Sequence, residues 1–228
     1  MFRDFFTNRA SEAPQLPFLL QFFLLALLVM CLYATYHNYQ KAWFRSCFWW
    51  VQFAQVLVLY SWYALMAMPW SESLPFYHCR LAMLVLLFGK NGLFKKYFAY
   101  LGLFGSIVAF IYPVFDPFPF PHITFFTFVI GHYALAVNSL TYLLKVSSKA
   151  LRVRQITIIT LLVNGFIGIV NSITEGNYGF LRQTPIINST HSVLNFYLVT
   201  LVCVVAIFFV QEILSHLFKK VDGQLLNE

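Results

Sequence analysis

The residues with most chemical potential are three consecutive side chains and one isolated histidine. His78, Cys79 and Arg80 follow one another, and His132 lies inside a long apolar stretch. Cysteine can act as a nucleophile, histidine can transfer protons, and arginine can bind phosphate or carboxylate. We therefore predict catalytic roles for Cys79, His78 and His132, and an anion-binding role for Arg80. The structural alternative is an interfacial Arg80 beside a Cys79 that only packs.

A second polar set follows helical spacing. Intervals of four, three and four residues place four side chains on one face of a helix: Asn164, Gly168, Asn171 and Glu175. Asn177 and Tyr178 follow, where glycines interrupt the helix. Amides and small residues also hold membrane helices together, which is the alternative interpretation. The predicted substrate-binding residues are Arg80, Asn171, Glu175, Asn177 and Tyr178.

These residues need apolar helices to position them. The chain of 228 residues is 60% hydrophobic and only 10% charged, whereas soluble domains are about a quarter charged. Seven apolar segments are separated by charge or proline: Leu16–Tyr33, Cys47–Met68, Tyr77–Phe88, Tyr97–Tyr112, Ile123–Leu144, Ile156–Thr174 and Leu194–Leu214. The third is shorter than the usual span of about 20 residues. We predict an all-α fold, one domain over residues 1–228, with seven transmembrane helices and an uncleaved first helix.

The basic residues indicate an orientation. Eleven Lys and Arg fall on one set of loops and the tail: Lys41, Arg45, Lys90, Lys95, Lys96, Lys145, Lys149, Arg152, Arg154, Lys219 and Lys220. Four fall on the other side: Arg3, Arg9, Arg80 and Arg182. The positive-inside rule then predicts an outside N-terminus and a cytoplasmic C-terminus. The net charge of +7 predicts contact with anionic lipid at the cytoplasmic loops, and no nucleic-acid motif accompanies it.

This topology brings the polar residues to one depth. Cys79 begins the third helix on the outer side, His132 lies about 13 Å inside the fifth, and Asn171 to Tyr178 end the sixth at the outer surface. We expect one cavity open to the outer leaflet. Cysteine, histidine and amide donors beside acyl chains favour acyl transfer or hydrolysis on a membrane lipid.

Several other classes of site lack their patterns. The four cysteines show no CxxC or Cys/His metal spacing, so we predict no metal site. There is no Gly-rich phosphate loop, GxSxG elbow or HExxH pair, and we predict no cofactor. An internal repeat is not evident, which disfavours a secondary transporter.

The order of these motifs resembles a known family. Leu74-Pro75 with Cys79, then His132, then Glu175 to Tyr178 and Pro185, resembles the YwaF-type family of bacterial integral membrane proteins. That family is similar to transmembrane protein 164, an animal acyltransferase of ether phospholipids. The resemblance implies about seven spans in a bacterial plasma membrane, Cys79 as acyl acceptor and His132 as its base. It also implies that Asn177 and Tyr178 shape the pocket. Relatives often have histidine where this chain has Tyr77.

The leading hypothesis is therefore a lipid acyltransferase or lipid-ester hydrolase embedded in the membrane. The alternative is a non-enzymatic binder or transporter of a small lipid or amphiphile, which would use the same cavity without chemistry. A structural or assembly subunit is a third reading, although the sequence indicates no particular protein partner.

Overall fold

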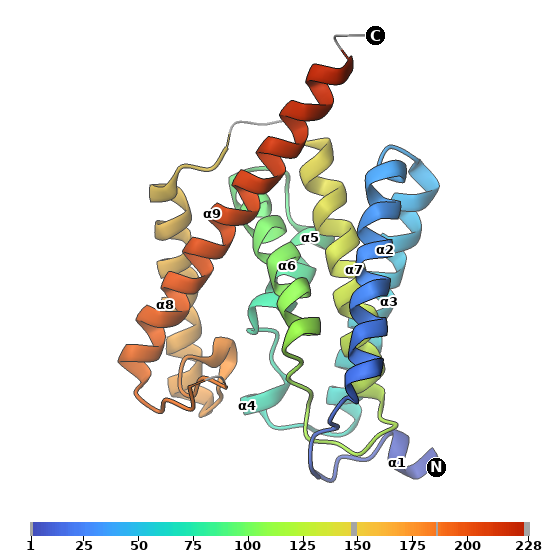
Figure 1. The fold of residues 1–228 in the computed structure, drawn as a ribbon. Helices are drawn as coiled ribbons and strands as arrows, with labels where there is room; N and C mark the ends of the chain where they lie inside the picture. The colour runs from blue at the N-terminus through green and yellow to red at the C-terminus, as the bar shows by residue number, and fades with distance from the viewer. Residues whose placement is uncertain (1, 147–149, 186, 226–228) are drawn as a thin grey trace.

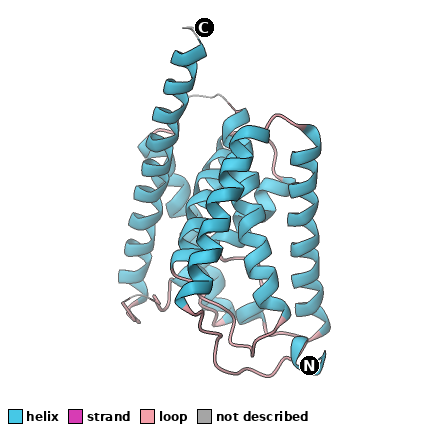
Figure 2. Cartoon of the chain, turned by 45° about the vertical axis from the view of Figure 1, so that its right-hand side comes forward, coloured by secondary structure: helices cyan, strands magenta, loops and turns pink. Residues whose placement is uncertain are grey.

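The computed structural model describes residues 2–146, 150–185 and 187–225, and all regular structure within them is helical (Figure 2). Lys149 lies outside this range, as do the side chains of Arg3, Lys219 and Lys220. The elements are α1 (Phe2–Phe5), α2 (Phe18–Asn38), α3 (Ala42–Leu65), α4 (Trp70–Ser73), α5 (His78–Phe88), α6 (Leu93–Ile111), α7 (Ile123–Lys145), α8 (Val153–Thr174), η1 (Tyr178–Phe180) and α9 (Ser192–Leu225).

Five of the described helices are long and apolar enough to cross a membrane: α2, α6, α7, α8 and α9. Helix α3 has 24 residues but is less apolar, because amides interrupt it. Helix α5 has 11 residues, so it is about 16 Å long, roughly half the hydrocarbon thickness. An all-helical, multi-pass membrane fold is thus confirmed.

The helix boundaries depart from the apolar segments at their polar ends. The first segment was expected to end at Tyr33, but α2 continues to Asn38, whose Nδ2 donates to the Ala34 carbonyl. The fourth was expected to start at Tyr97, but α6 begins at Leu93. Hydropathy marks where lipid contact ends, whereas backbone hydrogen bonding continues through amphipathic residues.

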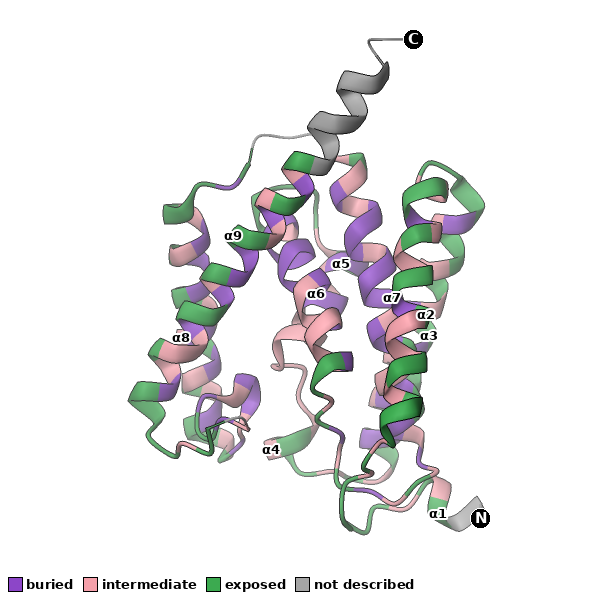
Figure 3. Cartoon of the chain, viewed as in Figure 1, coloured by how far each residue is buried: buried purple, intermediate pink, exposed green. Residues whose placement is uncertain are grey.

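The core lies between α6 and α7. Helix α7 contacts α2, α3, α5 and α6, while α6 also contacts α9. Over half of the apolar stretch of α6 and α7 is buried (56% and 61%), against 11% for α2 and 28% for α8 and α9 (Figure 3). The central pair therefore carries the interior, and the outer helices present large apolar side chains outward, as a lipid environment requires.

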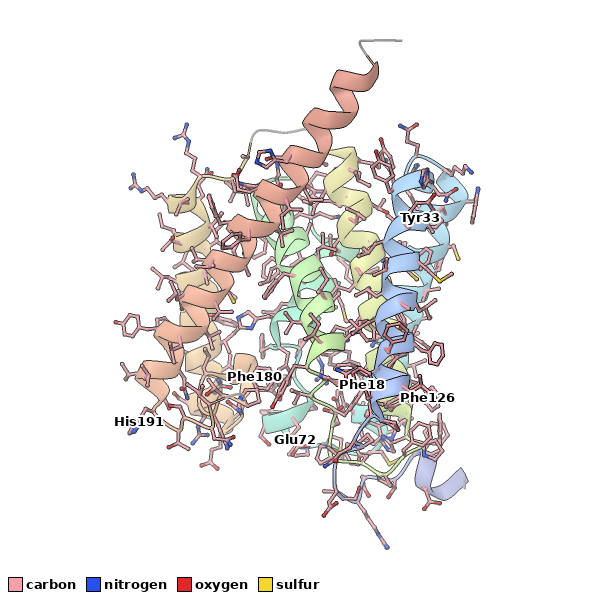
Figure 4. The ribbon with its side chains drawn as sticks, in the orientation of Figure 1. Phe18, Tyr33, Glu72, Phe126, Phe180 and His191 are labelled. Atoms are coloured by element: carbon pink, nitrogen blue, oxygen red, sulfur yellow. The ribbon has the colours of Figure 1, made fainter. Side chains whose placement is uncertain are left out.

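The two ends of the bundle differ in construction. At the lower end of Figure 1 lie α1, α4 and η1, and the turns α2–α3 and α5–α6 lie at the upper end. Figure 4 shows Glu72, Phe180 and His191 at the lower end and Tyr33 at the upper end. Two hydrogen bonds fix the N-terminal segment at the lower end. Ser11 N–H donates to the Pro117 carbonyl (2.8 Å), and the Trp62 indole donates to the Phe6 carbonyl (3.2 Å).

Candidate functional site

Three consecutive residues at the start of α5 face three different neighbours. An extended Tyr77 precedes the helix, so α5 begins abruptly at His78. His78 is directed to α8, Cys79 to α6, and Arg80 to α3 and the α6–α7 loop. Successive helical positions point about 100° apart, so the three side chains do not form a single triad.

Cys79 packs against a glycine on α6. A Cβ at Gly105 would lie 2.7 Å from the Cys79 Sγ, so any larger residue would force the thiol to shift. One helical turn towards the upper end, a Cβ at Gly102 would meet Ala82 of α5 and Leu135 of α7. Cys79 lies three residues before Ala82, and His132 lies three before Leu135. Both α5 and α7 run from the lower end to the upper end beside α6. Equal steps of three residues back along these two helices therefore bring Cys79 and His132 to the same level of the bundle.

The hydrogen bonds of His132 fix its tautomer. Its Nδ1–H donates to the Phe128 carbonyl one turn earlier (2.7 Å), because a carbonyl can only accept. Nε2 then keeps its lone pair, and no described residue bonds to it. The residue is 8% exposed, and its ring lies 4.3 Å from the Phe128 ring centroid. Nε2 is therefore the atom at which this histidine can accept a proton.

Arg80 is held by groups that the sequence did not single out. Its Nη2 donates to the Tyr63 hydroxyl (2.7 Å) and lies 3.8 Å from the Asp116 carboxylate. The guanidinium also lies over the Tyr63 and Tyr77 rings, at 5.2 and 5.0 Å. The predicted anion clamp therefore already contacts an anion of the same chain. The sequence did contain a signal for this pair: Asp116 is a single acid in a proline-rich loop, and Arg80 is a single arginine at the start of a membrane helix on the same side.

The same cluster affects a neighbouring acid on α4, outside the membrane-spanning segments. Burial, followed by the negative charge of Asp116, raises the pKa of the Glu72 carboxyl. This carboxyl therefore favours its neutral form more than it would in water.

His78 belongs to a chain of hydrogen bonds between helices. Its Nε2–H donates to Asn164 Oδ1 (2.7 Å), and Asn164 Nδ2 donates to Thr200 Oγ1 (2.9 Å). The ring packs on Gly179, whose φ of +64° favours glycine and whose Cβ would lie 2.9 Å from His78. The chain links α5, α8 and α9, and it directs His78 away from the side of α5 that carries Cys79.

The remaining predicted side chains build the loop after α8. Asn171 bonds both backbone groups of Tyr178, donating to its carbonyl (2.9 Å) and accepting from its N–H (2.8 Å). The Tyr178 hydroxyl donates to the Trp70 carbonyl (2.5 Å) and accepts from Leu74 N–H (2.8 Å). The loop is thereby tied to the segment that leads into α5.

Asn177 and Glu175 complete this loop in different ways. Asn177 accepts from the N–H groups of Arg182 and Gln183 and donates to the Gln183 carbonyl. Glu175 is exposed and left-handed (φ 58°), which ends α8. The expected helical face is therefore buried at Asn164 and Asn171 but reaches the surface at Glu175.

A cavity of about 360 Å³ opens between α8 and α9 at the lower end. Two of the predicted substrate-binding residues, Asn171 and Glu175, line this cavity together with Arg182. The other lining residues are Gly168, Ser172, Leu181, Ser192 and Phe196. Cys79 and His132 do not line it. The sequence-predicted residues thus fall into two groups, one around α6 and one around η1. Within the described chain, no three His, Cys, Asp or Glu residues are grouped to hold a metal ion.

Comparisons with known proteins place the chain at family level. The curated proteins and the solved structures gave no match. A family model, described as the TMEM164 family, matches residues 7–211, which is most of the sequence. This agrees with the predicted relation to transmembrane protein 164 and with the apolar helical fold. The chain belongs to the TMEM164 family.

Proposed function

We propose that this protein is a lipid acyltransferase or lipid-ester hydrolase whose reaction centre consists of Cys79 and His132. The observation that carries the proposal is their common level on α5 and α7, two helices that contact each other and pack on the same glycine-lined side of α6, where Gly105 leaves space for the thiol. The free lone pair of His132 Nε2 adds to it. Family membership supports a membrane protein but assigns no reaction.

The proposed topology has seven spans, with an outside N-terminus and a cytoplasmic C-terminus. Helices α3 and α5 are the added spans, since both contact the buried α7 and need not meet lipid on all sides. The lower end then faces outside and the upper end faces the cytoplasm of a bacterial cell. Reporter fusions to the α5–α6 and α7–α8 turns test this, and an outside location for either turn would contradict it.

The proposed chemistry conserves atoms and charge. His132 Nε2 takes the Cys79 proton, and the thiolate attacks the ester carbonyl carbon of a membrane lipid. The ester C–O bond breaks, the leaving oxygen takes the proton from His132, and a thioester and a lysolipid result. An acceptor hydroxyl, or water in the hydrolase version, then attacks the thioester and restores the thiol. In direct hydrolysis, His132 would instead activate water without the thioester.

The other predicted residues take supporting roles in this proposal. Arg80 follows Cys79 directly and is bound to Asp116, so in this proposal it supplies positive charge at the start of α5. His78 positions the start of α5 through Asn164. The loop after α8, against which His78 packs, is shaped by Asn171, Asn177 and Tyr178. Glu175 lines the cavity between α8 and α9.

The test is lipid mass spectrometry on cells and on purified protein. His132→Ala should abolish turnover and Cys79→Ser should abolish the acyl thioester, with both proteins still folded in detergent. Cys31→Ala, another half-buried cysteine, and His191→Ala, an exposed histidine, are matched controls that should keep full activity. Full turnover by folded His132→Ala would refute the assignment. Activity of Cys79→Ser without thioester would assign direct water attack.

The α8–α9 cavity favours a second candidate, a non-enzymatic binder of a small lipid or amphiphile. Asn171, Glu175 and Arg182 supply polar contacts there without a nucleophile. This candidate predicts co-purified lipid, no turnover, and loss of that lipid in Arg182→Gln. Turnover that survives Arg182→Gln and fails in His132→Ala would contradict it.

A further inference from the structure

A second cavity lies at the upper end of the bundle, away from Cys79 and His132. Its volume is about 390 Å³, and α3, α5, α6, α7 and the α5–α6 turn surround it. Its polar lining consists of Arg45, Asn91, Lys95, Asn138, Thr141 and Lys145. Trp49, Leu86 and Leu87 form an apolar wall. None of the lining residues is acidic, so three cations share one recess without a carboxylate.

Two of these cations are held in position by the backbone. Lys95 Nζ donates to the Gly89 carbonyl (3.1 Å) and lies 5.5 Å from the Tyr142 ring centroid. The Arg45 guanidinium donates to the carbonyls of Tyr39 and Gln40. An ammonium has three donors and a guanidinium five, so donors remain for a ligand. By contrast, Lys145 is exposed, as are Lys41 and Arg154 outside the cavity, so Arg45 and Lys95 are the two cations that the recess holds in place.

Thr141 provides an independent sign of a missing partner. Its side chain is 7% exposed and lines the cavity, yet Oγ1 bonds to no residue in the described part of the chain. An unsatisfied buried hydroxyl costs about 1–3 kcal/mol, and such groups are rare in folded proteins. Because Thr141 belongs to the cavity wall, an anionic oxygen bound in the recess would supply the acceptor that this hydroxyl lacks.

We propose that this upper cavity binds a phosphate group, and specifically the phosphate of an anionic lipid headgroup at the membrane surface. Three cations and a hydroxyl match phosphate oxygens. The volume accommodates a headgroup, and Trp49 and Leu87 give the cavity an apolar wall beside its cations. The site stands on this geometry alone, so it does not depend on acyl transfer at Cys79.

Native mass spectrometry of the purified full-length protein tests the site. The probes are dioleoyl phosphatidylglycerol and, as the comparison lipid that carries no phosphate, dioleoylglycerol. Replacing the two half-buried cavity cations, Arg45→Gln with Lys95→Gln, should weaken phosphatidylglycerol binding about tenfold to thirtyfold. The control Lys41→Gln with Arg154→Gln removes the same charge from exposed positions and should change binding less than threefold.

Thr141→Val keeps the shape of the side chain and removes the hydroxyl. It should weaken phosphatidylglycerol binding about threefold to tenfold, while the lipid-free protein unfolds at the same or a higher temperature, because an unsatisfied group has been removed. This second variant keeps the test valid if the double variant folds poorly. Unchanged binding by Thr141→Val would overturn the role of the hydroxyl and the site with it.

The source of the phosphate is decided by competition with inorganic phosphate. Displacement of phosphatidylglycerol at millimolar phosphate would assign a soluble phosphate compound, whereas persistence of the lipid would assign the headgroup. Equal losses in the cavity and control double variants would overturn the proposal, because diffuse attraction to the leaflet would then explain the binding. Equal affinity for the two lipids would overturn it as well.

Discussion

The corner formed by α8, α9 and η1 and the centre formed by α5, α6 and α7 use polar side chains differently. In the corner, Asn164, Asn171 and Asn177 are each bonded through both oxygen and nitrogen, while Asn195 is bonded through its nitrogen alone. In the centre, His132 keeps an unbonded Nε2, and Ser139 Oγ is buried without a partner among the described residues. Saturated amides hold helices together, whereas unsaturated atoms remain available for a substrate or water.

The comparison also separates two histidines that look alike in sequence. His78 uses Nε2 to hold Asn164, so its ring is part of the corner although it lies on α5. His132 uses only Nδ1, and does so within its own helix. Proximity to Cys79 in sequence is therefore the weaker guide, and the common level around α6 is the stronger one. The following substitutions test this division.

The largest expected effect is on the corner. Asn171→Leu removes both bonds to the Tyr178 backbone and leaves its buried N–H and C=O unsatisfied. The free energy of unfolding in detergent should fall by about 3 kcal/mol. Ser172→Ala, on the exposed side of the same turn, is the control and should change it by less than 0.5 kcal/mol. A small effect of Asn171→Leu would show that the corner is not held by saturated amides.

The next effect concerns the Arg80–Asp116 pair. Asp116→Asn leaves Arg80, whose side chain is only 16% exposed, without its negative partner, and we expect a loss of about 2 kcal/mol. Asp116 is one-third exposed, so solvent screening limits the loss. In a double-mutant cycle with Arg80→Gln, the two losses should be clearly non-additive. Additive losses would show that the ion pair is not an interaction of consequence.

The third substitution tests the centre through activity. Gly105→Ala places a Cβ 2.7 Å from the Cys79 Sγ and should displace the thiol, lowering turnover at least about tenfold, equivalent to about 1.4 kcal/mol. Gly165→Ala is the matched control, because a Cβ there meets no atom within 4 Å. Unfolding measurements establish that both variants are folded. Unimpaired turnover by Gly105→Ala would remove the main support for a Cys79 nucleophile.

The smallest effect is a pH dependence at the lower end. His122 caps α7: Nδ1 accepts from Thr124 N–H, and Nε2–H donates to the Thr7 carbonyl. Burial lowers the pKa of His122 from its ordinary 6.5, despite the bond to Thr7 and the charge of Asp116. The neutral ring therefore stabilises the fold above pH 6.5, and this stability is lost as the pH falls.

Thermal unfolding across pH 7.5 to 5 measures that loss. His122→Asn keeps a capping acceptor but cannot titrate, so its unfolding temperature should fall less with pH than that of the unmodified chain. At pH 7.5 the variant should lose about 1 kcal/mol, mainly through the missing contact with Thr7. Identical slopes for the two proteins would assign the pH dependence to other groups.

The sequence predicted the helical membrane fold well because lipid imposes long apolar stretches. It also predicted the burial of Asn164 and Asn171, since residues three or four apart share a helix face. These features depend on local spacing, which a single sequence retains.

Contacts between distant segments could not be predicted in the same way. Asp116 meets Arg80 only because a proline-rich loop folds over α3, and His122 meets Thr7 across 115 positions. Asn177 and Tyr178 were expected to shape a pocket, but their side-chain polar atoms form hydrogen bonds with backbone groups of the surrounding loops. Loop hydrogen bonds depend on backbone direction, which residue types alone do not reveal.

The 11 residues of α5 have a geometric consequence for the whole bundle. Cys79 lies at its first turn, and Leu87, on the wall of the upper cavity, lies only about 12 Å further along the axis. A rod of full bilayer length in this position would occupy the upper recess. The short α5 thus leaves space for the upper cavity at its C-terminal end and places the Cys79 thiol at its N-terminal end. Inserting one helical turn after Phe88 should fill the cavity without moving Cys79.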